Sequence, residues 1–239
     1  MISDGWSDGG YREAADAYQI DGRIRVLKHA DTFAVFDRYG NIRPVAAGEE
    51  GVYHHGTRFV SCLMLDIDDA CPFFLSSTVR DDNDQLTVAL TNPHLRCPKL
   101  NPLPMGSLHI ARRIFLRHGA CYQEVTVENH SRQRIATRLR IRYAADYADI
   151  FEIQGMARKA RGEVLPPSVE TSAVVLSYRG LDHLERRTRF EFSPATDICA
   201  SAAIFELSLE PREVARLYIT ARCEPVGVSA PRRLKFDEA

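Results

Sequence analysis

Alternation between apolar and polar residues, with a period of two, recurs along almost the whole chain. The stretch "ATRLRIRY" is the clearest case: Leu139, Ile141 and Tyr143 would lie on one face of an extended strand, and arginines would lie on the other. This spacing predicts a strand with one buried face and one face that contacts water or a partner. Helical periodicity is hard to find, so the pattern favours an all-β fold.

Turn signals separate the alternating stretches at intervals typical of β-hairpins. We expect about a dozen strands, near residues 23–29, 32–37, 58–67, 73–79, 85–91, 107–117, 120–129, 134–143, 173–179, 186–192, 202–209 and 214–223. This is too many for a simple immunoglobulin-like sandwich. The sequence therefore predicts a large two-sheet antiparallel β-sandwich, of the super-sandwich type, with short helical turns in its loops.

Two segments interrupt the alternation. Residues 92–106 hold four prolines and are expected to form a long surface connection, because proline cannot donate to a sheet. Residues 146–170 mix short apolar pieces with charge and contain Pro166 and Pro167. We expect a second long loop there, and long loops often carry function or form interfaces.

Length and charge narrow the range of partners. A chain of 239 residues fits one large β-domain, and 31 basic against 32 acidic residues leave a net charge of -1. Such a balance argues against nucleic acid and membrane surfaces as partners. No apolar run approaches the roughly 18 residues of a membrane span, and the first residues lack the pattern of a signal peptide. We expect a soluble, cytoplasmic protein.

The six cysteines are scattered, without a C-x-x-C pair or finger-like histidine spacing. This argues against a structural zinc site. Cys62, Cys121 and Cys223 fall inside strand-like runs, so we expect them to be reduced core residues with no catalytic role.

The stretch "ADYADIFEIQG" places Asp146, Asp149 and Glu152 at a spacing of three. In a helical turn they would share one face. A glycosidase needs two carboxyl groups about 5 to 9.5 Å apart, although such pairs usually come from separate elements. The alternatives are that these residues cap a helix and bind arginines, thereby anchoring a loop, or that they lie in a domain interface.

The stretch "GVYHHGTRF" contains adjacent His54 and His55, which would point in different directions and so would not form a metal pair. One of them, or His94 or His109, could act as an acid or base, as a histidine does in sugar mutarotases. The alternative is a turn at Gly56 that leads into a strand, with Arg58 binding a carboxylate.

The run "VRDDNDQL" is as rich in oxygen ligands as a calcium loop, but it lacks the glycine and distal glutamate of an EF-hand. We expect Arg80, Asp81 and Asp82 to lie in a solvated hairpin loop, and we expect no metal site. Motifs for nucleotide binding, acyl transfer and phosphoryl transfer are absent from the sequence.

Six stretches of the chain are informative when taken together. They are "LKHADTFAVFDRYGNIRP", "GVYHHGTRFVSCLMLDI", "FFLSSTVRDDNDQLTVALTNP" and "RYAADYADIFEIQG", followed by "YRGLD" and "RRTRFEFSP". Together they resemble the N-terminal domain of bacterial glycogen debranching enzymes of the amylo-α-1,6-glucosidase type. The resemblance implies a β-sandwich packed against a following (α/α)6 toroid, which holds the acid and base that hydrolyse the α-1,6 branch point. That toroid is missing from the sequence, so the resemblance assigns no catalytic residue and no cofactor to this chain.

The resemblance also implies an organisation and a surface. Residues 1–22 would be an N-terminal extension, 23–224 the sandwich, and 225–239 a linker stub towards the helical domain. The residues expected to contact that domain, in cis or in trans, or to form a wall of its α-glucan site, are Arg58, Arg80, Asp81, Asp82, Asp146, Asp149 and Glu152. Family members tend to have an acidic residue near position 55, so this turn is expected to lack a salt bridge to Arg58.

Two other functions stay open. One is a mutarotase-like sugar epimerase that uses a histidine and a carboxylate. The other is a stand-alone carbohydrate-binding module, for which the sequence offers no obvious aromatic platform, with one tryptophan near the terminus and nine tyrosines.

Overall fold

The computed structural model describes residues 24–44, 48–95, 103–158, 160–194 and 196–225. Within these ranges the chain forms sixteen strands in three antiparallel sheets, with one four-residue helix, α2 (Ile150–Ile153). The predicted all-β antiparallel sandwich is confirmed, although one of the two predicted sheets is divided into two. The expected extension 1–22 lies outside the described residues, as does all of the expected linker except Pro225, which ends the last strand.

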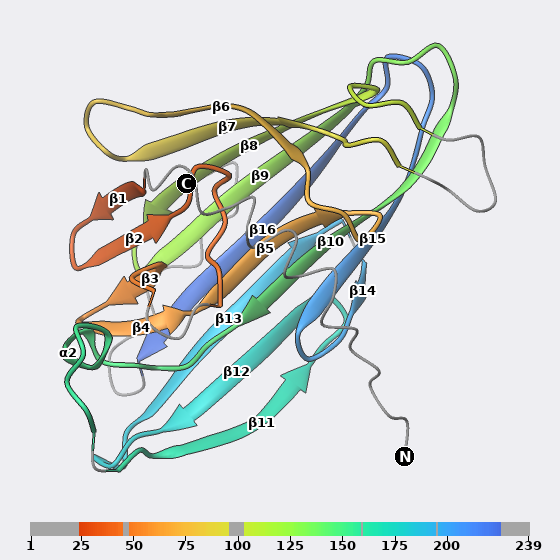
Figure 1. Ribbon diagram of the computed structural model, residues 1–239. Coiled ribbons are helices and arrows are strands. Elements are labelled where there is room, and N and C mark those ends of the chain that lie inside the picture. The colour runs from red at the N-terminus through yellow and green to blue at the C-terminus, as the bar shows by residue number, and fades with distance from the viewer. Residues whose placement is uncertain (1–23, 45–47, 96–102, 159, 195, 226–239) are drawn as a thin grey trace.

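Two four-stranded sheets make up one layer (Figure 1). Sheet A consists of β1 (Arg25–His29), β2 (Thr32–Phe36), β3 (Gly51–His54) and β4 (Thr57–Val60). Sheet B has the order β14 (Asp197–Ile198), β15 (Ala202–Leu209), β10 (Ile135–Ala144) and β5 (Cys62–Ile67). Only Ser61 separates β4 from β5, and its N–H donates to the carbonyl of Ala144 at 2.9 Å. The chain therefore passes from sheet A into sheet B almost without interruption.

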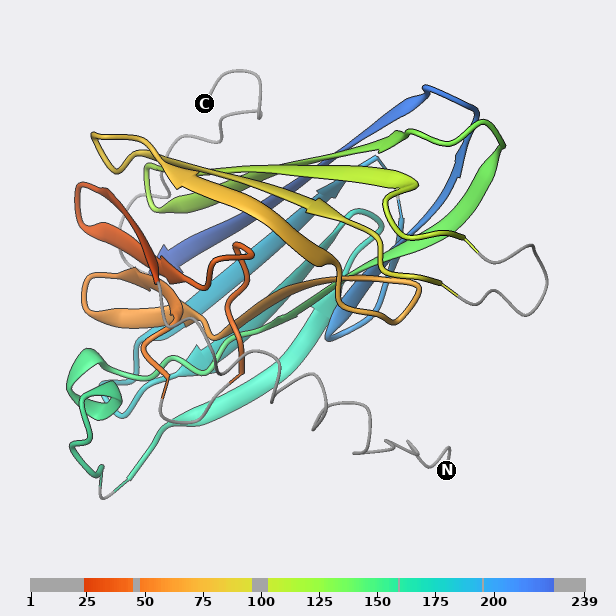
Figure 2. The same cartoon turned by 45° about the horizontal axis from the view of Figure 1, so that its top comes forward.

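Sheet C is the other layer and has eight strands. Their order is β11 (Glu163–Val169), β12 (Ala173–Arg179), β13 (Glu185–Ser193), β16 (Val214–Pro225), β9 (Ala120–Asn129), β8 (Leu108–Arg117), β7 (Gln85–Thr91) and β6 (Phe73–Val79). Figures 1 and 2 show sheet C extending from the β6–β7 hairpin to β11, with sheets A and B against its inner face. The buried hydroxyl of Thr188 in β13 donates to the carbonyl of Phe59 in β4 at 2.7 Å and so joins the two layers.

The core lies between the layers and follows the predicted alternation. In β8, Leu108, Ile110 and Ile114 point inward, and in β10 Leu139 and Ile141 do the same; all are buried. Burial of such side chains stabilises the fold by about 1.5–3 kcal/mol each. The predicted division of "ATRLRIRY" into a buried and a more exposed face is confirmed.

One inward position of β8 is occupied by a charge. Arg112 is buried and donates through Nη1 to the carbonyl of Tyr39 and to Oδ1 of Asn41, both at 2.6 Å, and through Nη2 to Gln123 at 3.2 Å. These bonds hold the β2–β3 connection against sheet C. Buried arginines are tolerated when hydrogen bonds replace water in this way.

Three strands were not predicted. β3 is only four residues long, and β14 has two. β11 forms inside the expected loop 146–170, in spite of Pro166 and Pro167, because it is the edge strand of sheet C and its register shifts between Leu165 and Ser168. Proline is compatible with an edge strand that has such an irregularity. The predicted strand 58–67 is divided at Ser61 into β4 and β5.

The cysteine prediction is confirmed for the three strand residues: Cys62, Cys121 and Cys223 are free thiols in the core. Cys71 is partly buried and Cys199 is exposed, and both are free as well. Part of the proline-rich connection 92–106 lies outside the described residues, although Leu95 and Leu103 pair across it. The single helix in the described ranges is far too short to cross a membrane.

Candidate interaction site at the α2 end

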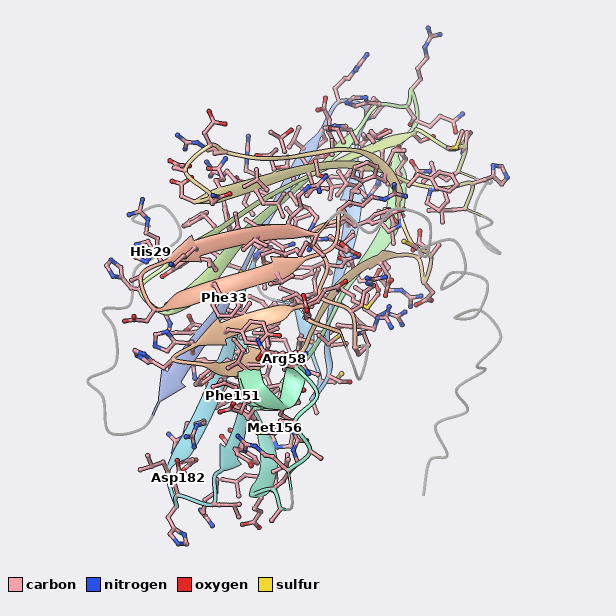
Figure 3. All side chains as sticks on the ribbon, turned by 60° about the vertical axis from the view of Figure 1, so that its left-hand side comes forward. His29, Phe33, Arg58, Phe151, Met156 and Asp182 are labelled. Carbon is pink, nitrogen blue, oxygen red and sulfur yellow. The ribbon has the colours of Figure 1, made fainter. Side chains whose placement is uncertain are left out.

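Turns from distant parts of the sequence gather at one end of the sandwich, which we call the α2 end. It comprises α2 and the turns at residues 30–31, 55–56, 80–84, 118–119 and 180–184. Backbone hydrogen bonds join these turns to one another and to neighbouring strands. The N–H of His55 donates to the carbonyl of Asp31 at 3.2 Å, that of Lys28 to the carbonyl of Asn83 at 3.1 Å, and that of Cys223 to the carbonyl of Gly119 at 2.9 Å. Figure 3 views this end directly. All seven residues predicted to contact a partner domain lie at or near it.

The β3–β4 hairpin explains the sequence "HHG". His55 and Gly56 both have positive φ, 47° and 75°, as a two-residue type I′ hairpin turn requires. His54 lies at the end of β3, where its Nδ1 is 2.8 Å from the hydroxyl of Thr32. Burial, and then the neighbouring His55, lower the pKa of His54. The predicted turn is confirmed.

Arg58, in β4, is a buried charge of the site that is held by several hydrogen bonds. It is 5% exposed, and its guanidinium donates to both carboxylate oxygens of Asp146, from Nε at 3.1 Å and from Nη2 at 2.5 Å. Nη1 donates to the carbonyls of Gly48 at 2.8 Å and Glu50 at 3.3 Å. Burial alone would lower the pKa of Arg58, but Asp146 outweighs it and the pKa is raised. Arg58 therefore binds a carboxylate, as predicted, and that carboxylate comes from residue 146.

The segment after Asp146 is held down by its backbone and by Tyr147. Ala148 accepts from the N–H of Arg58 at 2.8 Å, and Asp149 pairs with Thr57. Tyr147 adopts a positive φ of 53°, is buried, and donates its hydroxyl to the carbonyl of Leu176 at 2.7 Å. This conformation ends any helical path through residues 146–149.

The three carboxylates consequently do not share a helical face, because α2 begins only after Asp149. Asp149 is the N-cap and accepts from the N–H of Phe151 at 2.9 Å. Arg158 pairs with Asp149 at 3.3 Å and with Glu152 at 3.4 Å. Glu152 also pairs with Arg161 at 2.8 Å. With Asp146 bound to Arg58, each carboxylate holds part of the loop, and the geometry is that of anchors.

The 80–84 turn stands apart from these groups. It is the hairpin loop predicted between two strands. The N–H of Arg80 donates to the carbonyl of Gln85 at 2.9 Å and closes the loop, and Asn83 within it has a positive φ of 55°. Arg80 lies 3.8 Å from Asp84, and both Asp81 and Asp82 are exposed. None of the hydrogen bonds and ion pairs among the described residues joins this turn to Arg58 or to the three carboxylates.

Sequence reasoning missed the exposed apolar side chains of this end. Phe151 and Met156 are 59% and 63% exposed, and Leu181 and Leu184, in the turn before β13, are 61% and 52% exposed. None of the residues of α2 is buried. Figure 3 shows Phe151 on α2 and Met156 next to the helix, with Asp182 of the turn some way below them. The only signal in the sequence was apolar residues in a segment without alternation.

The four histidines considered as acids or bases have no carboxylate partner among the described residues. No hydrogen bond or ion pair joins the imidazole of His54, His55, His94 or His109 to a carboxylate there. The ring of His109 stacks on that of His130, and His130 pairs with Glu128 at 3.3 Å. Likewise, no group of three His, Cys, Asp or Glu residues in these ranges is arranged to hold a metal ion.

Solved structures that align with this chain share little sequence with it. A putative aldose 1-epimerase from Escherichia coli K12 is 9% identical, with a TM-score of 0.47 over 85% of this chain and 99% of that one. A putative kojibiose phosphorylase from the human microbiome is 10% identical, with a TM-score of 0.49 over 84% of this chain and 30% of that one. A galactose mutarotase-like protein from Lactobacillus casei is 10% identical, with a TM-score of 0.46 over 84% and 100%. Matches this distant transfer no function.

The sequence itself gives a clearer assignment. No curated protein matches the chain. Residues 27–220, however, match the family described as the N-terminal domain of some glycogen debranching enzymes, and this range runs from β1 into β16. The chain therefore belongs to the family of N-terminal domains of glycogen debranching enzymes.

Proposed function

We propose that this chain is a non-catalytic β-sandwich domain that supports a helical (α/α)6 toroid glycosidase domain, in cis or in trans, in cytoplasmic α-glucan metabolism. The observation that carries the proposal is the family match, which covers nearly the whole described sandwich. A domain that occurs at the N-terminus of larger enzymes acts together with the domain after it.

The geometry of the α2 end favours a role in binding another domain over a role in catalysis. Asp146, Asp149 and Glu152 bind arginines or cap α2, and so they hold the loop rather than face each other across a substrate. Arg58 is buried and supports this surface from beneath. Arg80, Asp81 and Asp82 are exposed and stay predicted contacts.

The experiment is reconstitution in trans. The toroid of a family member, expressed separately, is mixed with this chain, and the mixture is examined by size-exclusion chromatography and by hydrolysis of α-1,6 linkages in a limit dextrin. We expect co-elution and a more active or more heat-stable toroid. Separate elution, with toroid activity unchanged by the sandwich, would contradict the proposal.

Contact with α-glucan needs its own measurement. Co-sedimentation with glycogen compares the chain alone, the toroid alone and the mixture. If the sandwich forms a wall of the glucan site, the mixture binds glycogen more tightly than the toroid alone. Equal binding by the mixture and the toroid would limit the domain to structural support.

A further inference from the structure

Four large apolar side chains project from two short segments of the α2 end. Phe151 and Met156 belong to α2 and the residues after it, and Leu181 and Leu184 belong to the turn between β12 and β13; each is more than half exposed. Single exposed apolar residues are common on protein surfaces, whereas a group of them marks an interaction site.

Arg186 pairs with Asp182 of the turn at 2.8 Å, and this hydrogen bond is the main cause that raises the pKa of Arg186. The charge of Asp149, the N-cap of α2, adds a smaller contribution. Tyr147 and Tyr178 stack beneath, with ring centroids 5.4 Å apart. Both segments therefore belong to the same end of the domain, and we call their four exposed side chains the apolar end surface: Phe151, Met156, Leu181 and Leu184.

Several described charges near this surface are paired within the domain. Arg158 and Arg161 pair with Asp149 and Glu152, and Arg186 pairs with Asp182. Apolar side chains surrounded by paired charges resemble the core and rim of a protein interface. A surface of this kind fits an apolar, weakly charged partner better than a polyanion or a strongly basic protein.

The chain leaves the sandwich at this same place. Pro225, the last residue of β16, is the Cα partner of Arg186. Polypeptide that continues beyond β16 therefore starts next to the turn that holds Leu181 and Leu184. Because the family is one of N-terminal domains, a following domain would begin its path at this part of the apolar end surface.

We propose that the apolar end surface is where the domain that follows this sandwich packs, through an apolar patch of its own. This inference rests on the proposed function and specifies its contact. Phe151 and Met156 would be central, since α2 buries none of its own residues in the sandwich. Large side chains at the centre of an interface usually contribute most to affinity.

The test measures binding of the full chain to the separately expressed toroid of a family member by isothermal titration calorimetry. Phe151→Ser with Met156→Ser forms one double variant, and Leu181→Ser with Leu184→Ser forms another. Phe73→Ser with Leu75→Ser is the matched control, because these side chains of edge strand β6 are also 48% and 53% exposed. Unchanged thermal unfolding verifies that each variant is folded.

We expect Kd to rise at least about tenfold for the α2 variant and to stay within about twofold for the control. A photo-crosslinking amino acid at position 151 should join the toroid, and the same group at position 73 should not. If the wild type binds and both double variants of the apolar end surface bind equally well, the inference is wrong while the proposed function stands. If the wild type itself does not bind, the proposed function fails, and the inference fails with it.

Discussion

Arg58 and Asp146 form a two-pronged ion pair across 88 positions of sequence, and the pair joins sheet A to the loop that leads into α2. The guanidinium is almost inaccessible, whereas the carboxylate is 29% exposed. The pair therefore gives a buried charge the partner that it requires, and it adds to the backbone bonds and the Tyr147 hydroxyl that hold the loop.

Removal of the arginine is predicted to destabilise the domain. Arg58→Ala leaves Asp146 and two carbonyls without their donor, which should cost about 3 kcal/mol and lower Tm by roughly 6–12 °C. Thermal unfolding followed by circular dichroism measures this. Arg80→Ala is the control, since Arg80 is 60% exposed and should change stability by less than about 0.5 kcal/mol. Equal Tm values for the two variants would contradict the structural role of Arg58.

The β3–β4 turn gives a second prediction, in the stabilising direction. His55 has a φ of 47° in a turn that asparagine followed by glycine fits best. His55→Asn should therefore raise stability by about 0.5 kcal/mol. Gly56→Ala should lower it by about 1 kcal/mol through backbone conformation alone, because a Cβ there would meet nothing within 4 Å. Urea unfolding of both variants tests the turn, and opposite signs are required.

The buried carboxyl group of Asp37 should make the stability of the domain depend on pH. Burial raises its pKa from 3.8 to about 6; the backbone of Asn41 opposes this, Glu50 adds to it, and Arg112 and Arg43 oppose it. As the pH rises, the Asp37 carboxyl therefore loses its proton at a lower pH in the unfolded chain than in the folded chain. The contribution of this proton to stability is complete below about pH 4 and is lost as the pH rises through 6, with a total change of roughly 3 kcal/mol.

The corresponding experiment is urea unfolding between pH 4.5 and 8. Asp37→Asn keeps an oxygen for the N–H groups of Tyr39 and Asn41, and should flatten the fall in stability over this range. Part of the slope should persist, because burial also raises the pKa of Asp66 to about 6. Asp81→Asn, at an exposed position, should leave the slope unchanged. An Asp37→Asn slope equal to the wild-type slope would show that Asp37 is ionised at pH 5.

The cysteine thiols should differ in their reactivity towards alkylating reagents according to their burial. Burial raises the pKa of Cys62 and of Cys121 to about 12, and it raises the pKa of Cys223 as well. Alkylation by iodoacetamide, located by peptide mass spectrometry, should modify Cys199 in the folded chain and leave these three unmodified until urea unfolds it. Modification of Cys121 at the rate of Cys199 in the folded state would contradict the packing of sheet C.

The alternation of the sequence was sufficient to predict the long strands, because strands such as β8 and β10 bury one complete face. It was insufficient for β3, which has four residues, and for β11, where prolines conceal an edge strand. Short strands contain too few alternating positions to differ from a turn, and an edge strand with both faces exposed has no hydrophobic pattern.

The sequence was sufficient to predict several residues of the site, but it was not sufficient to predict how these residues are arranged in space. A carboxylate partner for Arg58 was predicted, yet the identity of that partner depends on how β4 meets a segment far along the chain. The spacing of Asp146, Asp149 and Glu152 would place them on one face only if the whole stretch were helical, and the positive φ of Tyr147 delays the start of the helix. The exposure of Phe151 and Met156 depends on tertiary packing alone, which no local pattern reports.

The two prolines of β11 also affect how copies of this domain behave towards one another. An eight-stranded sheet ends in a row of backbone groups to which a strand of another molecule can add. Pro166 and Pro167 have no N–H groups to offer another strand, and the register shift beside them bends this edge. The outer edge of sheet C is thereby a poor template for intermolecular pairing, which protects the domain from aggregation at high concentration.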